Sequence, residues 1–253
     1  MQETSAKRNT LLITGCSSGI GETAARLLSQ RGYRVFATAR REEDVVRLQA
    51  AGLEALRLDL NDSTSIRQAV DEILERTGGT LFALFNNGDY GQPGAVEDLT
   101  RETLRAQFET NLFGWHELTC QVIPVMRRQG RGRIVQNSSI LGLVAMAYRG
   151  AYNASKFALE GLTDTLRLEL AGSGIAVSLI EPGPIATRFR ENAYRKWQEN
   201  VDGEHSVHRA RYQAMAARLQ TKGAAVPFTL PPQAVVRKLI HALESPRPRP
   251  RYY

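Results

Sequence analysis

The chain has 253 residues, of which 42% are hydrophobic, and a formal net charge of +7. That length suits one α/β domain with a complete core, so we predict a single domain over residues 1–253. The sequence has no apolar run near the roughly 18 residues of a membrane span, and residues 1–8 are expected to form a loose polar tail rather than a secretory signal. Two widely spaced cysteines favour a reducing, cytoplasmic location over a disulfide framework.

The basic charge is a feature that nucleic-acid-binding proteins share. Here the cationic residues are scattered among acidic ones, apart from the run PRPRPR at 246–251. We therefore expect no nucleic-acid partner and attribute part of the charge to binding of an anionic phosphate cofactor. The four histidines lack the spacing of metal ligands, so no metal site is predicted, and His205 and His208 are interpreted as a solvated pair.

Strand and helix signals alternate along the chain. Apolar runs of strand length occupy 10–14, 33–38, 53–58, 80–86, 132–138 and 175–181. Helical periodicity occupies 19–31, 42–51, 63–76, 101–129, 151–171 and 232–244, with N-caps expected at Asn61–Asp62 and Thr100 and a helix start at Pro231 and Pro232. The alternation predicts a Rossmann-like, doubly wound parallel sheet with helices on both faces, which binds ligands at the carboxyl ends of its strands.

Two segments depart from this pattern. Residues 188–230 form a long polar stretch directly after the sixth strand, which favours a substrate lid over a peripheral helical pair without a role. Its aromatic residues, Phe189, Tyr194, Trp197, Tyr212 and Phe228, indicate an apolar, bulky substrate. The last residues, RPRYY, resemble the start of one more strand, and the sequence leaves open whether the natural protein continues past Tyr253.

A glycine-rich turn, TGCSSGIG, occupies residues 14–21 between the first strand and the first helix. Glycine lets a backbone turn tightly and approach a pyrophosphate, and the free N–H groups at a helix start attract the anion. The strand–turn–helix context distinguishes this pattern from glycines that serve only a tight turn. We predict cofactor contacts from Gly15, Ser17, Ser18, Gly19, Ile20 and Gly21.

The second predicted strand runs into Ala39, where the dinucleotide-binding pattern has an acid that holds the ribose hydroxyls. Arg40 and Arg41 follow instead. Arginine binds a 2′-phosphate through paired hydrogen bonds, whereas a carboxylate repels it. The sequence therefore favours NADP(H) over NAD(H), with Arg40 as the phosphate ligand; the alternative is that both arginines are ordinary surface charges.

Tyr152 and Lys156 stand four residues apart, on one face of a predicted helix. An ammonium about 4–5 Å from a phenolate, at an effective dielectric constant of about 20, stabilises it by roughly 3–4 kcal/mol. We expect the lysine to lower the pKa of the tyrosine towards the range of a general acid–base catalyst. Ser139, or its neighbour Ser138, either donates to a substrate oxygen or caps the next turn, and the side chain of Asn111 could hold a water that joins Lys156 to solvent.

Together these motifs resemble the classical short-chain dehydrogenase/reductase family over nearly the whole chain, and TGCSSGIG and YNASKFALEGL resemble its hydroxysteroid and retinol dehydrogenase branch. The resemblance implies that Tyr152 exchanges the proton, that Lys156 lowers its pKa and binds the nicotinamide ribose, that Ser139 steadies the substrate oxygen, and that Asn111 maintains a proton relay. It also implies a homodimer or homotetramer and further cofactor contacts from Asp59, Leu60, Asn87, Tyr152, Lys156, Pro182, Gly183 and Thr187.

One segment departs from the family pattern. Where the family reads Asn-Asn-Ala-Gly, residues 86–89 read NNGD, so that Asp89 brings a negative charge near the cofactor. It could weaken cofactor binding, position a substrate, or have no effect. The expected function is NADP(H)-dependent hydride transfer between nicotinamide and a carbonyl or secondary alcohol of an apolar small molecule; the alternative is a non-catalytic regulator that senses NADP(H).

Overall fold

The computed structural model describes residues 9–221, 223 and 227–253, so the expected tail over 1–8 lies outside the described residues. Seven parallel strands form one sheet in the order β3-β2-β1-β4-β5-β6-β7. The strands are β1 (Thr10–Ile13), β2 (Arg34–Ala39), β3 (Glu54–Arg57), β4 (Ala83–Asn86), β5 (Gly132–Asn137), β6 (Ile175–Ile180) and β7 (Arg251–Tyr252). All six predicted strands are confirmed, and RPRYY does open a further strand, which pairs with β6.

The helices of the described chain follow the predicted periodicity closely. They are α1 (Gly19–Gln30), α2 (Glu42–Ala50), α3 (Ser63–Thr77), α4 (Arg101–Phe108), α5 (Gly114–Gln129), α6 (Gly150–Glu169), α7 (Phe189–Asn200), α8 (Arg209–Gln220) and α9 (Gln233–Glu244). Asp62 caps α3 by accepting from the N–H of Thr64 at 2.9 Å, and Thr100 caps α4. The helix predicted over 101–129 is not continuous, because a π-helical turn, η2 (Glu109–Phe113), divides α4 from α5.

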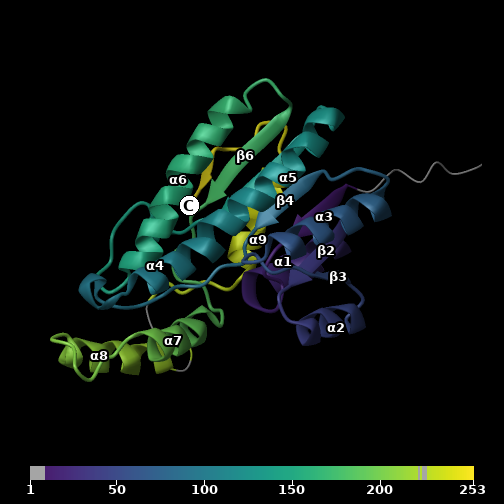
Figure 1. Cartoon of the computed structure of the whole chain (residues 1–253). Helices are drawn as coiled ribbons and strands as arrows, with labels where there is room; N and C mark the ends of the chain where they lie inside the picture. The colour runs from purple at the N-terminus through teal and green to yellow at the C-terminus, as the bar shows by residue number, and fades with distance from the viewer. Residues whose placement is uncertain (1–8, 222, 224–226) are drawn as a thin grey trace, which may run out of the picture.

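Helices cover both faces of the sheet, as predicted (Figure 1). Successive strand residues point to opposite faces, so Leu11 and Ile13 join one apolar core while Leu12 joins the other. The first core includes apolar residues of α1, α2 and α9, and the second includes those of α3, α5 and α6. Burial on both faces explains why the strands appear in the sequence as continuous apolar runs.

Helices α7 and α8, from the predicted lid segment, lie across the carboxyl ends of the strands and apart from the two helical layers (Figure 1). The segment between β6 and α7 is tied to the chain before α9 by backbone hydrogen bonds between Ala186 and Leu230 and between Leu230 and Pro184. The two helices therefore stand over the edge of the sheet at which ligands bind in this architecture.

Candidate active site

The glycine-rich turn lies between β1 and α1, where the strand order of the sheet reverses. Gly15 has a φ of +70°, and a Cβ there would lie 2.4 Å from the Cα of Gly88. A Cβ on Gly21 would lie 2.3 Å from the carbonyl oxygen of Gly15. Ser18 precedes α1 without capping it through its side chain in the described structure. The turn is therefore packed too closely for side chains, and the first N–H groups of a helix such as α1 are suited to bind an anion.

The predicted cofactor residues that follow β3 and β4 also lie at this edge. Asn87 donates through Nδ2 to the carbonyl oxygen of Thr14 at 3.0 Å and accepts at Oδ1 from Asn137 at 3.0 Å. It thereby joins the glycine-rich turn to β5. Asp59 accepts at Oδ1 from the N–H of Asn61 at 3.0 Å, and Leu60 is buried.

Arg40 and Arg41 differ in their surroundings. Arg41 forms ion pairs with Glu43 at 2.9 Å and with Asp44 at 3.1 Å, which hold it at the start of α2. Arg40 is exposed at the carboxyl end of β2, and its guanidinium makes no hydrogen bond or ion pair within the described residues. Of the two arginines, Arg40 is the one available to bind a phosphate.

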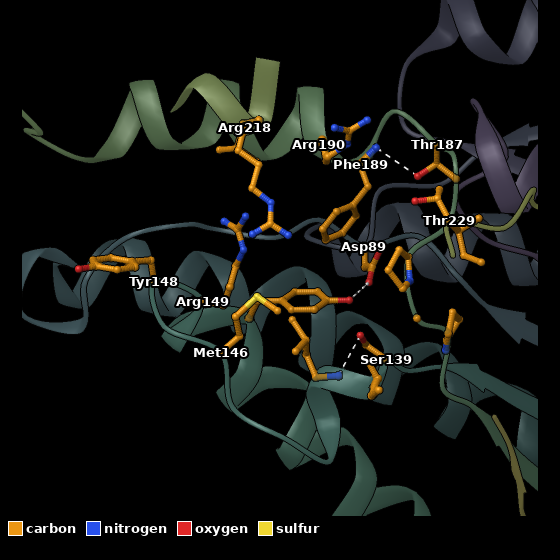
Figure 2. A pocket seen from close by; sticks show the side chains of 18 of the residues that line it. Asp89, Ser139, Met146, Tyr148, Arg149, Thr187, Phe189, Arg190, Arg218 and Thr229 are labelled. Carbon is orange, nitrogen blue, oxygen red and sulfur yellow. Dashed lines mark hydrogen bonds between the residues drawn. The ribbon is translucent and has the colours of Figure 1, made fainter. Parts of the chain in front are cut away.

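Tyr152 and Lys156 lie one turn apart on α6, and both contact Asp89, which is labelled in Figure 2. Lys156 is fully buried; its Nζ lies 2.8 Å from Oδ2 of Asp89 and donates to the carbonyl oxygen of Asn137 at 2.8 Å. The hydroxyl of Tyr152 donates to the same Oδ2 at 3.5 Å. The residue that departs from the family pattern thus binds both members of the proposed acid–base pair.

The pKa of Tyr152 is raised well above its usual value, mainly by burial and then by the charge of Asp89, while an interaction with Ser139 opposes the shift. The expected shift of this pKa towards the range of a general acid–base catalyst is therefore not found in this structure. The physical reason is first the burial of the phenol and then the carboxylate of Asp89, whose charge acts on the phenol in the opposite direction to the ammonium of Lys156.

Ser139 caps the next turn, which is one of the two roles that the sequence left open, and its donation to a substrate oxygen stays a prediction. Its Oγ accepts from the N–H of Leu141 at 3.1 Å, which caps the turn at Ile140–Gly142, and the residue also lines the cavity beside Tyr152. Ser138 lines the same cavity, and its buried Oγ has no partner among the described residues. Two hydroxyls therefore follow β5 at this point.

Asn111 lies buried in the π-helical turn. Its Nδ2 donates to the carbonyl oxygen of Tyr90 at 2.9 Å, and its Oδ1 accepts from the N–H of Tyr90 at 3.3 Å. A π-helical turn displaces one residue from the α-helical register and is frequent at functional sites. Asn111 therefore fixes the backbone next to Asp89, and its part in a proton relay stays a prediction.

A cavity of about 610 Å³ opens beside Tyr152. The sequence-predicted residues that line it are Ile20, Ser139, Tyr152, Pro182, Gly183 and Thr187. Of the five lid aromatics, Phe189 lines the cavity and packs 5.4 Å from the ring of Tyr152. Trp197 instead contacts Tyr194 and Tyr212, which joins α7 to α8, and Phe228 is 91% exposed. Of these five aromatic residues, Phe189 is therefore the one described as lining the cavity, and the apolar, bulky substrate stays a prediction.

Sequence reasoning missed two neighbours of Lys156. The Trp115 ring lies 4.5 Å from Nζ, and Asn137 supplies a carbonyl oxygen to it. Trp115 stands one helical turn after Asn111, which is a spacing that the sequence shows. Asn137 contacts Lys156 through its backbone carbonyl oxygen, so no side-chain pattern in the sequence predicts this contact.

Other parts of the described chain offer little further chemistry. They contain no group of three or more His, Cys, Asp or Glu residues placed to hold a metal ion, and none of their helices is both long and apolar enough to cross a membrane. His205 is exposed beside Asp202, whereas His208 is half-buried between Tyr148 and Glu97, so the interpretation as a solvated pair is wrong for His208.

A doubly wound parallel sheet with a glycine-rich turn at its switch point defines a dinucleotide-binding α/β protein. The sequence profile described as short chain dehydrogenase matches residues 9–198, and the chain belongs to that family of NAD(P)-dependent oxidoreductases. Uncharacterized oxidoreductase YbbO of Escherichia coli (strain K12) is 41% identical over 97% of this chain and 85% of its own length. Human 17-beta-hydroxysteroid dehydrogenase type 1 is 35% identical over 97% of this chain and 77% of its own. The resemblance to the hydroxysteroid branch is confirmed.

Solved structures show the same fold. An actinorhodin polyketide ketoreductase with NADPH is 31% identical, with a TM-score of 0.77 over 94% of this chain and 91% of the other. A short-chain dehydrogenase/reductase from Burkholderia phymatum in complex with NAD is 25% identical, with a TM-score of 0.82 over 100% of this chain and 89% of the other. The structural neighbours thus include one protein solved with NADPH and one solved with NAD.

Proposed function

We propose that this oxidoreductase uses NADP(H) to interconvert a carbonyl and a secondary alcohol on a small apolar molecule, with Tyr152 as the proton donor or acceptor. The observation that carries the proposal is that Tyr152 and Ser139 line one cavity next to the glycine-rich turn, with Nζ of Lys156 buried 5.5 Å from the centre of the Tyr152 ring. A regulator that only senses NADP(H) has no use for a buried tyrosine–lysine pair at the cavity, so we favour the enzyme.

The residues present fit a dinucleotide that carries a 2′-phosphate. A Cβ at Gly15 or Gly21 would clash with backbone within 2.4 Å, so the turn is built for close approach, and Arg40 stands unpaired within the described chain at the end of β2. We propose that Arg40 binds the 2′-phosphate and that Pro182, Gly183 and Thr187 border the nicotinamide. When bound, the nicotinamide supplies or accepts the hydride.

The chain's own groups manage the oxygen and the proton. Ser139 holds the substrate oxygen, and the Tyr152 hydroxyl gives it a proton during reduction. Nζ of Lys156 lies 5.5 Å from the centre of the phenol ring and pairs with Asp89, and Asn111 fixes the segment that carries Asp89. We further propose that α7 and α8 act as the substrate lid, that the enzyme works in the cytoplasm, and that it forms a homodimer or homotetramer.

Removal of one hydroxyl tests the mechanism. Tyr152→Phe should lower kcat for NADPH-dependent carbonyl reduction by about 10²–10⁴-fold, the usual contribution of a general acid, because the proton donor is lost. NADPH affinity, measured by fluorescence titration, should change little. Tyr194→Phe, in the α7–α8 contact, is the matched control and should keep its activity. Turnover of Tyr152→Phe at the wild-type rate across a panel of carbonyl compounds would exclude the proposed role.

A further inference from the structure

Two guanidinium groups face each other in the cavity. Arg149 precedes α6 and Arg218 lies on α8; both line the cavity, and Figure 2 shows their guanidinium groups close together. Burial, and then the charge of Arg218, lowers the pKa of Arg149. Arg149 is half-buried and Arg218 is exposed. Neighbouring like charges repel each other, so an anion bound between the two guanidinium groups would stabilise this arrangement.

Neither guanidinium has a counter-ion in the described structure. Nη1 of Arg149 is buried without a hydrogen-bond partner among the described residues, and the side chain of Arg218 makes no hydrogen bond or ion pair with them. Among the residues described as lining the cavity, Asp89 is the one carboxylate, and it is held by Lys156 at 2.8 Å. Lys156 is therefore paired with a carboxylate, whereas Arg149 and Arg218 are not.

Other residues of the cavity suit an apolar body. Its lining includes Leu141, Met146, Ile185, Ala214, Met215 and Leu219. Arg211 also lines it and stands seven residues before Arg218, on the same face of α8. The cofactor phosphates belong at the glycine-rich turn and near Thr187, which lies on the other side of Phe189 and Asp89 from the arginine pair (Figure 2). A different anion is needed at the pair.

We propose that Arg149 and Arg218 bind the anionic head group, a carboxylate or a phosphate, of an otherwise apolar carbonyl substrate. The planar guanidinium offers paired N–H donors that match the oxygens of either group, and two such heads can hold one anion from two sides. The inference rests on the proposed function, because it places the carbonyl of the same molecule at Tyr152 and Ser139.

Matched aldehydes that differ in one end group test the proposal. We would compare dodecanal with 12-oxododecanoate, using NADPH and the full-length protein. The wild type should reduce the charged aldehyde with the higher kcat/KM. Arg149→Gln and Arg218→Gln should each lower the charged-to-neutral ratio of kcat/KM by about tenfold or more, because a hydrogen-bonded charge is lost. Arg218→Lys should retain part of the ratio, and Arg218→Glu should invert it.

Arg209→Gln is the control, because Arg209 lies on the same helix but pairs with Glu204. It should leave the ratio unchanged. A wild-type ratio near one, or a ratio that Arg149→Gln and Arg218→Gln leave unchanged, would overturn the inference while reduction of either aldehyde still supports the proposed reaction.

Calorimetric titration with dodecanoate, dodecyl phosphate and dodecanol separates the inference from the reaction if neither aldehyde is reduced. Binding of at least one anionic ligand that weakens about tenfold in Arg149→Gln and Arg218→Gln, with no such change for dodecanol, supports the anion site without any turnover. The stronger of the two anions identifies carboxylate or phosphate. Equal binding of anions and alcohol by the wild type, or anion binding that the variants do not change, contradicts it.

Discussion

At the scale of single residues, Asp89 changes the chemistry that the family motif implies. Its carboxylate lies 2.8 Å from Lys156 Nζ and 3.5 Å from the Tyr152 hydroxyl. A carboxylate there pairs with the ammonium of Lys156 and also disfavours the phenolate form of Tyr152. The charge of this residue should therefore set the pH range in which Tyr152 exchanges its proton.

The first residue-scale prediction concerns Asp89→Asn. Loss of the charge should lower the pKa of Tyr152, because Asp89 raises it. Alcohol oxidation requires the phenolate and increases as pH rises through this pKa, so its pH–rate profile should move to lower pH. Carbonyl reduction requires the phenol and should decline at a correspondingly lower pH. Asp62→Asn, at the cap of α3, is the control, and identical profiles for wild type and Asp89→Asn would contradict the prediction.

Arg40 should give the enzyme its preference for NADPH over NADH. Arg40→Ala should raise KM for NADPH by about tenfold or more and leave KM for NADH nearly unchanged, because one charged hydrogen-bonding group to the 2′-phosphate is lost. Arg41→Ala is a matched control: Arg41 is already paired with Glu43 and Asp44, so both KM values should change far less. Steady-state kinetics with each cofactor checks this. Equal losses in the two variants would mean that neither arginine distinguishes the phosphate.

At the scale of elements, the short strand β7 is fixed to its neighbours by charge. Arg251 of β7 lies 3.0 Å from Glu181 after β6, 3.2 Å from Glu160 and 2.7 Å from Asp164 on α6. Three carboxylates share one guanidinium. Burial, followed by repulsion from Glu160, raises the pKa of Glu181 from 4.5 to about 7.

This shift predicts how stability depends on pH. Between pH 4.5 and about 7 the folded protein holds a proton on Glu181 that the unfolded chain has lost. The stabilisation is therefore complete below pH 4.5 and is lost as pH rises through about 7. Glu181→Gln removes this titration, so the Tm of the variant relative to wild type should be higher near pH 8 than near pH 5. The exposed Glu191→Gln serves as control, and a Tm difference that is constant with pH would refute the prediction.

At the scale of the whole molecule, apolar side chains remain exposed on the helices of one face. Phe113 is 48% exposed, Phe157 46%, Leu162 40% and Leu168 67%. The first ends the π-helical turn before α5, and the others belong to α6. Burial of such side chains against a second copy would remove apolar surface from water, which favours association.

We therefore expect light scattering to give the mass of a dimer or tetramer, and Leu162→Glu combined with Leu168→Glu should shift it to a smaller species, because two charges would be buried at the contact. Val46→Glu on α2, where Val46 is 56% exposed, is the control and should keep the wild-type mass. A wild-type monomer would contradict the expected assembly, and an unchanged mass in the double variant would place the contact elsewhere.

Local patterns in the sequence predicted the sheet and most of its helices, and they led to the candidate catalytic residues. Strands buried on both faces need continuous apolar runs, and a backbone turn packed within 2.4 Å of its neighbours needs glycine, so both are visible as local patterns. Tyr152 and Lys156 follow from helical spacing alone. The predicted caps at Asp62 and Thr100 are both present, because caps are local features too. The strand boundaries differ from the predicted ones by only a few residues.

The tertiary structure is needed to show which charged side chains lie next to each other. Asp89 and Lys156, like Arg149 and Arg218, come from distant parts of the chain and face each other because β4, α6 and α8 converge at one edge of the sheet. The π-helical turn at Asn111 and the packing of Trp197 between α7 and α8 likewise depend on neighbours that no local pattern specifies. The reaction class was therefore readable from short-range spacing, whereas the pKa of Tyr152 and the unpaired arginines required long-range electrostatics and packing.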